Sequence, residues 1–182
     1  MNKEKSHIHY FAIKLGVYAI LAILVFIFRE GLVENLRYFI GGLMLLYGLE
    51  ETWYEIFYSK KRFFHREKMY LGFIETLLGI VVLVTPISYE SVCIIWATWS
   101  ILRESYEIKE VLGEVKHLAP KIASGLESIV IIVFSIMLIA EPTEHHAMIH
   151  MYLLLVELIF SPLIPLVDEL LDNKKQEAEV KE

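Results

Sequence analysis

Cysteine is almost absent from this sequence, since Cys93 is the only one in 182 residues. A single thiol excludes a disulfide framework and any metal site built from several cysteines. The sequence also has no Gly-rich phosphate loop, no Gly-x-Ser-x-Gly nucleophile turn and no His-Glu-x-x-His helix. We therefore expect a protein that is not an enzyme and that carries no cofactor, with Cys93 as a buried, inert thiol.

Long polar segments are scarce as well, because apolar residues make up 56% of the chain. They fall into six stretches, each long enough as a helix to match a hydrocarbon core about 30 Å thick. The sequence predicts an all-α, polytopic membrane bundle of six transmembrane helices within residues 1–170. The predicted spans are residues 10–28, 36–58, 69–88, 91–108, 122–140 and 147–166.

Basic residues are scarce on one side of the predicted bundle. If the N-terminus, the connections after spans two and four and the C-terminus share a side, the other side holds only Arg29 and Arg37. Basic residues near span ends stay cytoplasmic, so we expect a multi-pass protein of the cell (inner) membrane with both termini in the cytoplasm. The cytoplasmic set is Lys3, Lys5, Lys60, Lys61, Arg62, Arg66, Lys68, Arg103, Lys109, Lys116, Lys121, Lys174, Lys175 and Lys181.

The six spans form three similar pairs. Connections at 29–35, 86–90 and 141–146 are short, so each pair should form an antiparallel hairpin. Each hairpin begins with a glycine in a similar place, Gly16, Gly72 and Gly125, where a small residue would let neighbouring backbones approach closely. All three hairpins have the same orientation, so we expect parallel repeats.

Hairpin two carries a family resemblance. Its first helix begins Gly72-Phe73-Ile74-Glu75 and leaves through Thr85-Pro86, and its second helix carries a Trp-x-x-Trp-Ser-Ile-x-x-Glu run from Trp96 to Glu104. Together with the six spans, these motifs resemble the HdeD-type acid-resistance membrane proteins over about residues 10–168. Hairpin one departs from the pattern, with Tyr18 or Ala19 where a glutamate is expected. The resemblance implies a role in surviving acid stress and no catalytic residues.

Ionisable residues lie inside the predicted spans. Each costs about 2.5–3.5 kcal/mol at the bilayer centre, so such groups should face the bundle interior, a water-filled cavity or a partner. Arg103 is the expected counter-charge, and Glu75 with Glu127 suggests a shared vestibule. The cluster either responds to protons or cations, or consists of hydrogen-bonded and snorkelling groups that fix helix register. Its members are Glu50, Glu75, Arg103, Glu127 and Glu157.

A second polar group lies on the predicted outer side. It comprises Glu144, His145, His146 and His150, and the last two histidines share a helix face at i,i+4 spacing. Imidazoles change charge between pH 5 and 8, so the group could sense external acid, and the spacing is also compatible with metal ligation. The alternative is a solvated loop with interfacial histidines. Whether a metal binds is unknown from sequence.

The remaining expectations concern partners. The basic loop at Lys60–Lys68 should attract anionic lipids of the inner leaflet, and nucleic acid need not be invoked. Residues 171–182 are charged and predicted to form a disordered cytoplasmic tail. The sequence leaves three functions open: a stress or acid-resistance factor, a small proton- or cation-coupled transporter or channel, and a scaffold that assembles with itself or with other membrane proteins.

Overall fold

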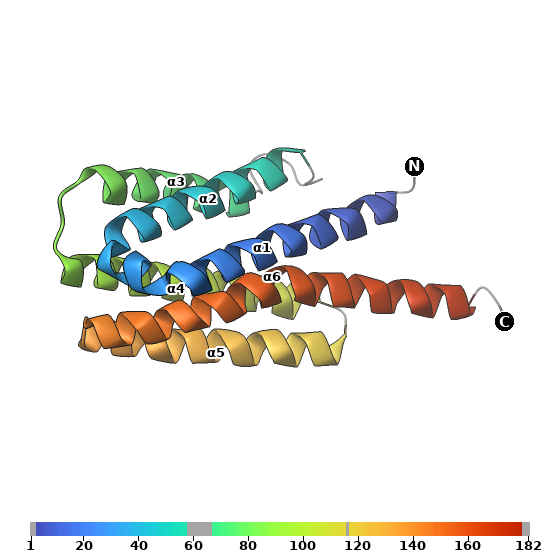
Figure 1. Ribbon diagram of the computed structural model, residues 1–182. Coiled ribbons are helices and arrows are strands. Elements are labelled where there is room, and N and C mark those ends of the chain that lie inside the picture. Colours follow the sequence, from blue (N-terminus) through green and yellow to red (C-terminus); the bar gives the residue numbers. More distant parts are fainter. Residues whose placement is uncertain (1–2, 58–66, 116, 180–182) are drawn as a thin grey trace. The chain divides into compact units, whose positions relative to one another are not determined.

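The computed structural model describes residues 3–57, 67–115 and 117–179 (Figure 1). Six α-helices make up nearly all of this described part, which confirms the all-α prediction. Their bounds are α1 Lys3–Glu34, α2 Leu36–Phe57, α3 Glu67–Val84, α4 Tyr89–Glu114, α5 Leu118–Ala140 and α6 Glu144–Glu179.

Three of the helical segments are long and apolar enough to cross a membrane: His9–Glu34, Leu118–Ala140 and Glu144–Asp172. Their length at 1.5 Å per residue exceeds the hydrocarbon thickness of about 30 Å, which is typical of a membrane protein. That α2, α3 and α4 also span the membrane remains a prediction.

The chain divides into two compact units. The first unit comprises Met1–Glu30 with Ala97–Glu182, and the second unit is Gly31–Trp96. The first unit therefore holds most of α1, the C-terminal part of α4, and α5 with α6. The second unit holds α2, α3 and the start of α4.

Glycines let α2 and α3 lie very close together in the second unit. They form two reciprocal pairs, Gly41 with Gly79 and Gly48 with Gly72, each pair seven residues from the next along its helix. A Cβ on Gly79 would lie 2.7 Å from the carbonyl oxygen of Gly41, and one on Gly72 would lie 2.8 Å from that of Gly48. Real Cβ atoms do not approach so closely, so glycine is required at this seam.

The close approach expected of the hairpin glycines is met at one of the three positions. Gly72 contacts Gly48, but among the described residues nothing lies within 4 Å of a Cβ built on Gly16 or Gly125. The glycine seam also joins the second helix of predicted hairpin one to the first helix of hairpin two. The tightest packing therefore crosses the predicted hairpins rather than closing one of them.

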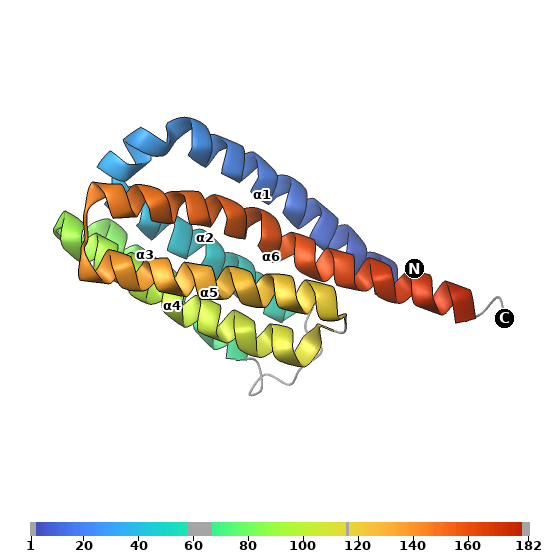
Figure 2. The ribbon, with the colours of Figure 1, turned by 90° about the horizontal axis from the view of Figure 1, so that it is seen from below.

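In the first unit, α5 and α6 pack antiparallel and are joined by a short turn (Figure 2). The buried face of α5 repeats with heptad spacing, the pattern of a helix that presents one stripe to its neighbours. Serines in that stripe keep the helices close, and the Ser135 hydroxyl donates to the Ile131 carbonyl at 2.8 Å. The stripe consists of Ser124, Ser128, Ile131, Ser135 and Leu138.

Several helix ends differ from the predicted bounds. The predicted connection 29–35 is helical up to Glu34, and α4 and α5 shorten the connection predicted at 109–121. Conversely, α3 ends at Val84 instead of continuing to residue 88, because Pro86 lacks an N–H and disfavours helical backbone in Thr85. Ser88 then caps α4, accepting the backbone N–H of Ser91 at 3.3 Å.

The predicted disordered tail is also corrected. Helix α6 continues to Glu179, past the end of its apolar pattern and through most of residues 171–182. The segment contains no glycine or proline and is rich in Lys, Glu, Gln and Ala, all strong helix formers, so the helix has no local reason to stop. Residues 180–182 lie outside the described part.

Candidate functional site

A buried ion pair joins α4 to α6 in the first unit. Arg103 Nε donates to Glu157 Oε1 at 3.3 Å, and the two side chains are 7% and 8% exposed. The guanidinium also lies 5.9 Å from the centroid of the Trp99 ring, one turn earlier on α4. A charged pair so deeply buried persists because each partner offsets the desolvation of the other.

Glu104 lies beside this pair and belongs to the same charged layer. Its side chain is 1% exposed and bonds to the Ser128 hydroxyl of α5. Arg103 stabilises its charge, whereas Glu157 and Glu107 act against it. Among the described residues, no hydrogen-bond partner meets Glu104 Oε1, although that atom is buried. Such an oxygen is costly to bury unless something donates to it or it carries a proton.

Glu127 of α5 completes the layer. The carboxylates of Glu107, Glu104 and Glu157 act electrostatically against a negative charge on its side chain. Its Oε1 is buried and meets no hydrogen-bond donor in the part of the chain that the structure describes. We call Arg103, Glu104, Glu107, Glu127 and Glu157 the carboxyl cluster.

Helical spacing explains how the cluster forms. Ser100, Arg103, Glu104 and Glu107 follow the i, i+3, i+4, i+7 pattern and therefore share one face of α4. On α5, Ser124, Glu127 and Ser128 are polar residues at i, i+3 and i+4 spacing and therefore share one face. From α6, Glu157 reaches this layer and supplies the carboxylate that Arg103 binds.

A second polar contact lies one turn along α4 from the ion pair. The Ser100 hydroxyl and His150 Nε2 are 3.1 Å apart, and both side chains are buried. His150 is thus directed into the helix packing of the first unit, not to the outer surface where the sequence predicts it. Its position seven residues before Glu157 places it on the same face of α6.

The other predicted members of the intramembrane cluster belong to the second unit. Glu75 of α3 is 1% exposed, and Glu50 of α2 is half-buried. Near Glu50, the side chains of Glu51 and Thr52 pack against Gly72 at the α2–α3 seam. Glu55 is also buried, at 3% exposed. These carboxyls therefore belong to α2 and α3, the two helices that pack closely through their glycines.

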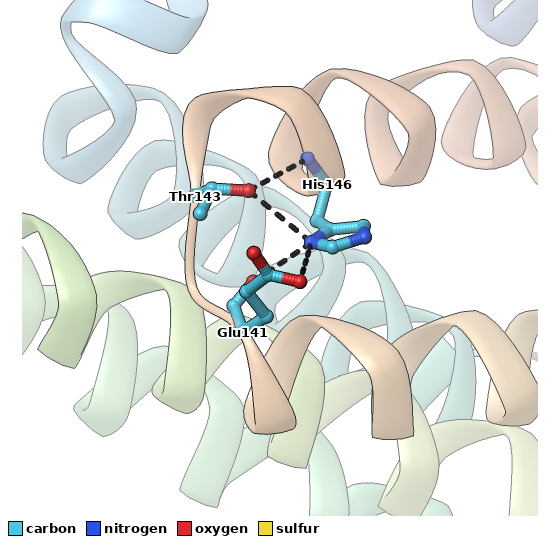
Figure 3. Close-up of polar contacts among 3 residues, drawn as sticks. All are labelled: Glu141, Thr143 and His146. Carbon is cyan, nitrogen blue, oxygen red and sulfur yellow. Dashed lines mark hydrogen bonds and ion pairs between the residues drawn. The ribbon is translucent and has the colours of Figure 1, made fainter.

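The predicted outer group divides between two environments. At the α5–α6 turn, the His146 backbone N–H donates to Thr143 Oγ1 at 3.3 Å, which makes Thr143 the N-cap of α6 (Figure 3). The His146 ring faces back onto the turn: Nδ1 lies 3.0 Å from the Glu141 carbonyl oxygen and 3.7 Å from Glu141 Oε2. His145 and Glu144 are exposed beside it. His146 therefore closes the turn, while His150 pairs with Ser100.

The predicted metal arrangement is not formed by these histidines. Although His146 and His150 are four residues apart, their rings bind Glu141 and Ser100, respectively. Among the described residues, no group of three or more His, Cys, Asp or Glu side chains is arranged to hold a metal ion. Cys93 is buried and free, as expected of an inert thiol.

Glu104, Glu107 and Ser128 were not among the predicted members of the cluster. The signal that could have identified them is the helical spacing of Glu104 and Glu107 from Arg103, which places three charged residues on one face. For Ser128 there was no such signal, because a serine in an apolar helix is usually interpreted as a small residue that allows close helix packing. The basic loop predicted at Lys60–Lys68 lies largely outside the described residues.

Comparison of the chain with protein-family models, curated proteins and solved structures gave no match in any of the three. The geometry of the carboxyl cluster is therefore the basis for the functional argument.

Proposed function

We propose that this chain is a non-enzymatic integral membrane protein that helps the cell to resist acid by exchanging protons at the carboxyl cluster. The observation that carries the proposal is the charge balance of Glu104 and Glu127. Three nearby carboxylates act electrostatically against a charge on Glu127, and Arg103 is bound to Glu157. Glu104 and Glu157 are buried, Glu107 and Glu127 are half-buried, and one guanidinium lies beside them, an arrangement that favours carboxyls that hold protons.

The proposal includes a topology of six spans in the inner membrane with both termini cytoplasmic. Three apolar helices and the one-sided distribution of Lys and Arg support it. The resemblance of hairpin two to HdeD-type proteins, which implies a role in acid stress, is independent support because it comes from the motifs at 72–86 and 96–104. We further propose that the bilayer is the main partner, with anionic lipids at the basic loop and self-association or another membrane protein as further partners.

Acid survival tests this function directly. Cells that lack the protein should lose viability faster in acid while growing normally at neutral pH, and the wild-type chain should restore survival. A Glu104→Gln/Glu127→Gln variant should not restore it, because the amide keeps the side-chain shape but cannot exchange a proton. The matched control is Glu30→Gln, an exposed position on α1 that should rescue fully. Full rescue by the double variant would reject a role for the cluster.

A second function, transport of protons or cations, is favoured by one observation. The buried polar contacts continue beyond the cluster to Ser100 and His150, as expected of a path rather than an isolated site. This reading predicts proton flux in liposomes that the Glu127→Gln variant abolishes. Absence of flux with retained acid protection would leave the resistance role and exclude transport.

A further inference from the structure

Two prolines lie inside α6, Pro162 and Pro165, and the helix continues through both of them. Proline has no backbone N–H, so the carbonyls of Leu158 and Ser161, four residues earlier, receive no hydrogen bond from these positions. Leu158 is fully buried and directly follows Glu157 of the carboxyl cluster. Helices bend most readily at such sites, so α6 has a deformable segment next to the cluster.

The part of α6 beyond the prolines, residues 166–179, is held to α5 through a carboxylate. We call this part the α6 arm. Asp168 Oδ1 of the arm accepts the backbone N–H of His117 at 2.9 Å, and the Asp168 side chain is 9% exposed. His117 is the N-cap of α5, and its own side chain makes no capping hydrogen bond. The first N–H groups of a helix need an acceptor, so Asp168 caps α5 from a neighbouring helix.

The prolines lie between two fixed points of α6. On one side, Glu157 is bound to Arg103 of α4, and on the other side Asp168 is bound to the start of α5. The two points are eleven residues apart, about 16 Å along a helix. A deformable segment between two anchored ones is the arrangement of a hinge. We call the contact of Asp168 with the His117 N–H the latch.

The α4–α5 junction offers a rigid surface for the arm to close against. Lys121 Nζ of α5 donates to the Leu112 carbonyl of α4 at 3.1 Å, which ties these two helices together. Between the cluster and the latch, each of the three helices has a buried apolar side chain: Val111 of α4, Pro120 of α5 and Ile164 of α6. Water and protons therefore reach the cluster faster from this end when the arm moves away from the junction.

We propose that the α6 arm is a gate. It swings on Pro162 and Pro165, the latch holds it shut, and its opening sets how fast protons reach the carboxyl cluster. The control of proton access rests on the proposed function, whereas the hinge and the latch do not. Motions of this kind set the rate of many membrane and soluble proteins without changing the chemistry at the site.

Hydrogen exchange at the His117 amide tests the latch, because this amide is its donor. The measurement uses the full-length protein in lipid nanodiscs. Asp168→Leu removes the acceptor and should raise the exchange rate about fivefold, the factor expected for one hydrogen bond of ordinary net strength. Asp168→Asn keeps a side-chain oxygen at this position and should exchange nearly as slowly as the wild type.

The same amide tests the hinge. Pro162→Ala/Pro165→Ala restores two helical hydrogen bonds, so the arm should open less often and His117 should exchange severalfold more slowly. This variant stiffens the helix and remains informative if Asp168→Leu does not fold. The matched control is Pro142→Ala in the α5–α6 turn, at the other end of α6, which should leave the rate unchanged. If the double proline variant exchanges at the wild-type rate, the hinge is overturned, and if Asp168→Leu does, the latch is overturned.

A pH jump followed by infrared spectroscopy tests the control of proton access. The band of protonated carboxyls should rise severalfold more slowly in Pro162→Ala/Pro165→Ala and faster in Asp168→Leu, with the final amplitude of the wild type in both. Equal rates at the wild-type amplitude would overturn the gate and leave the proposed function standing. If the wild type shows no such band at any pH, the proposed function fails and proton gating fails with it, while His117 exchange still decides the hinge and the latch.

Discussion

Arg103 and Glu157 form a buried ion pair across 54 positions of sequence, with Nε and Oε1 3.3 Å apart. The pair fixes the register of α4 against α6 at the level where Glu104 is buried and Glu127 half-buried. Because its partners come from two different helices, the pairing depends on the precise placement of α4 against α6.

Removal of Arg103 should destabilise the protein strongly. Arg103→Gln removes the guanidinium that compensates the buried Glu157 charge, and breaking such a pair costs about 3–5 kcal/mol. The double variant Arg103→Gln/Glu157→Gln should recover much of this loss, because no unpaired charge remains. Unfolding in mixed micelles measures both. Arg29→Gln is the control: its contact with Glu30 is more exposed and should contribute about 0–1 kcal/mol. Equal losses for Arg103→Gln and Arg29→Gln would contradict the buried pair.

The α2–α3 seam should reject a single methyl group. In Gly48→Ala, the new Cβ would overlap the Gly72 carbonyl and lie 2.5 Å from the Thr76 nitrogen, so the backbones must separate. Overpacking of this kind costs about 1–3 kcal/mol. Gly42→Ala is the matched control on the same helix, where nothing described lies within 4 Å and alanine favours the helix by up to about 1 kcal/mol. If Gly48→Ala unfolds at the same temperature as Gly42→Ala, the close approach is absent in solution.

Loss of the α6 cap should cost about 1 kcal/mol. Thr143→Ala removes the hydroxyl that accepts the His146 N–H and that contacts the His146 ring. Thr143→Ser keeps the hydroxyl and should retain most of the stability. Hydrogen exchange at the start of α6 measures the effect locally. Unchanged protection in the alanine variant would show that the turn is held by other contacts.

Glu90 should make stability depend on pH at the start of α4. Hydrogen bonds from its own backbone N–H and from the Ser88 hydroxyl lower the pKa of the Glu90 carboxyl. A lowered pKa in the folded state stabilises the protein above the ordinary glutamate range, and this contribution is lost as pH falls through the folded pKa. Glu90→Gln should therefore melt below the wild type at neutral pH and converge with it in acid. A difference that grows on acidification would have the wrong sign.

The helices could be predicted because apolar length is a strong local signal. All six helices occur where the apolar stretches predict them, and Pro86 marks the break between α3 and α4. Helix ends at charged segments could not be predicted, since residues such as those after Asp172 have high helix propensity but resemble a polar tail. Hydropathy carries no information on where such a helix stops.

The side-chain contacts between helices were harder to predict than the helices themselves. That Arg103 needs a carboxylate follows from its position in an apolar stretch, but which carboxylate depends on how α4 and α6 pack. His150 shows the same limit: its spacing from His146 indicates a shared site, whereas the structure gives each ring a different partner. The glycine seam was not predicted either, because the close approach of Gly41 to Gly79 depends on how α2 and α3 pack against each other.

The central claim, that the carboxyl cluster holds exchangeable protons, is tested most directly by infrared difference spectroscopy of the protein in lipid. Acidification of the wild type should increase the carbonyl band of protonated carboxyls that are shielded from water. The Glu104→Gln/Glu127→Gln variant should lose most of that signal, while the control Glu30→Gln/Glu144→Gln, changed at two exposed positions, should keep it. If the cluster variant retains the full signal, the protons lie elsewhere and the account is wrong.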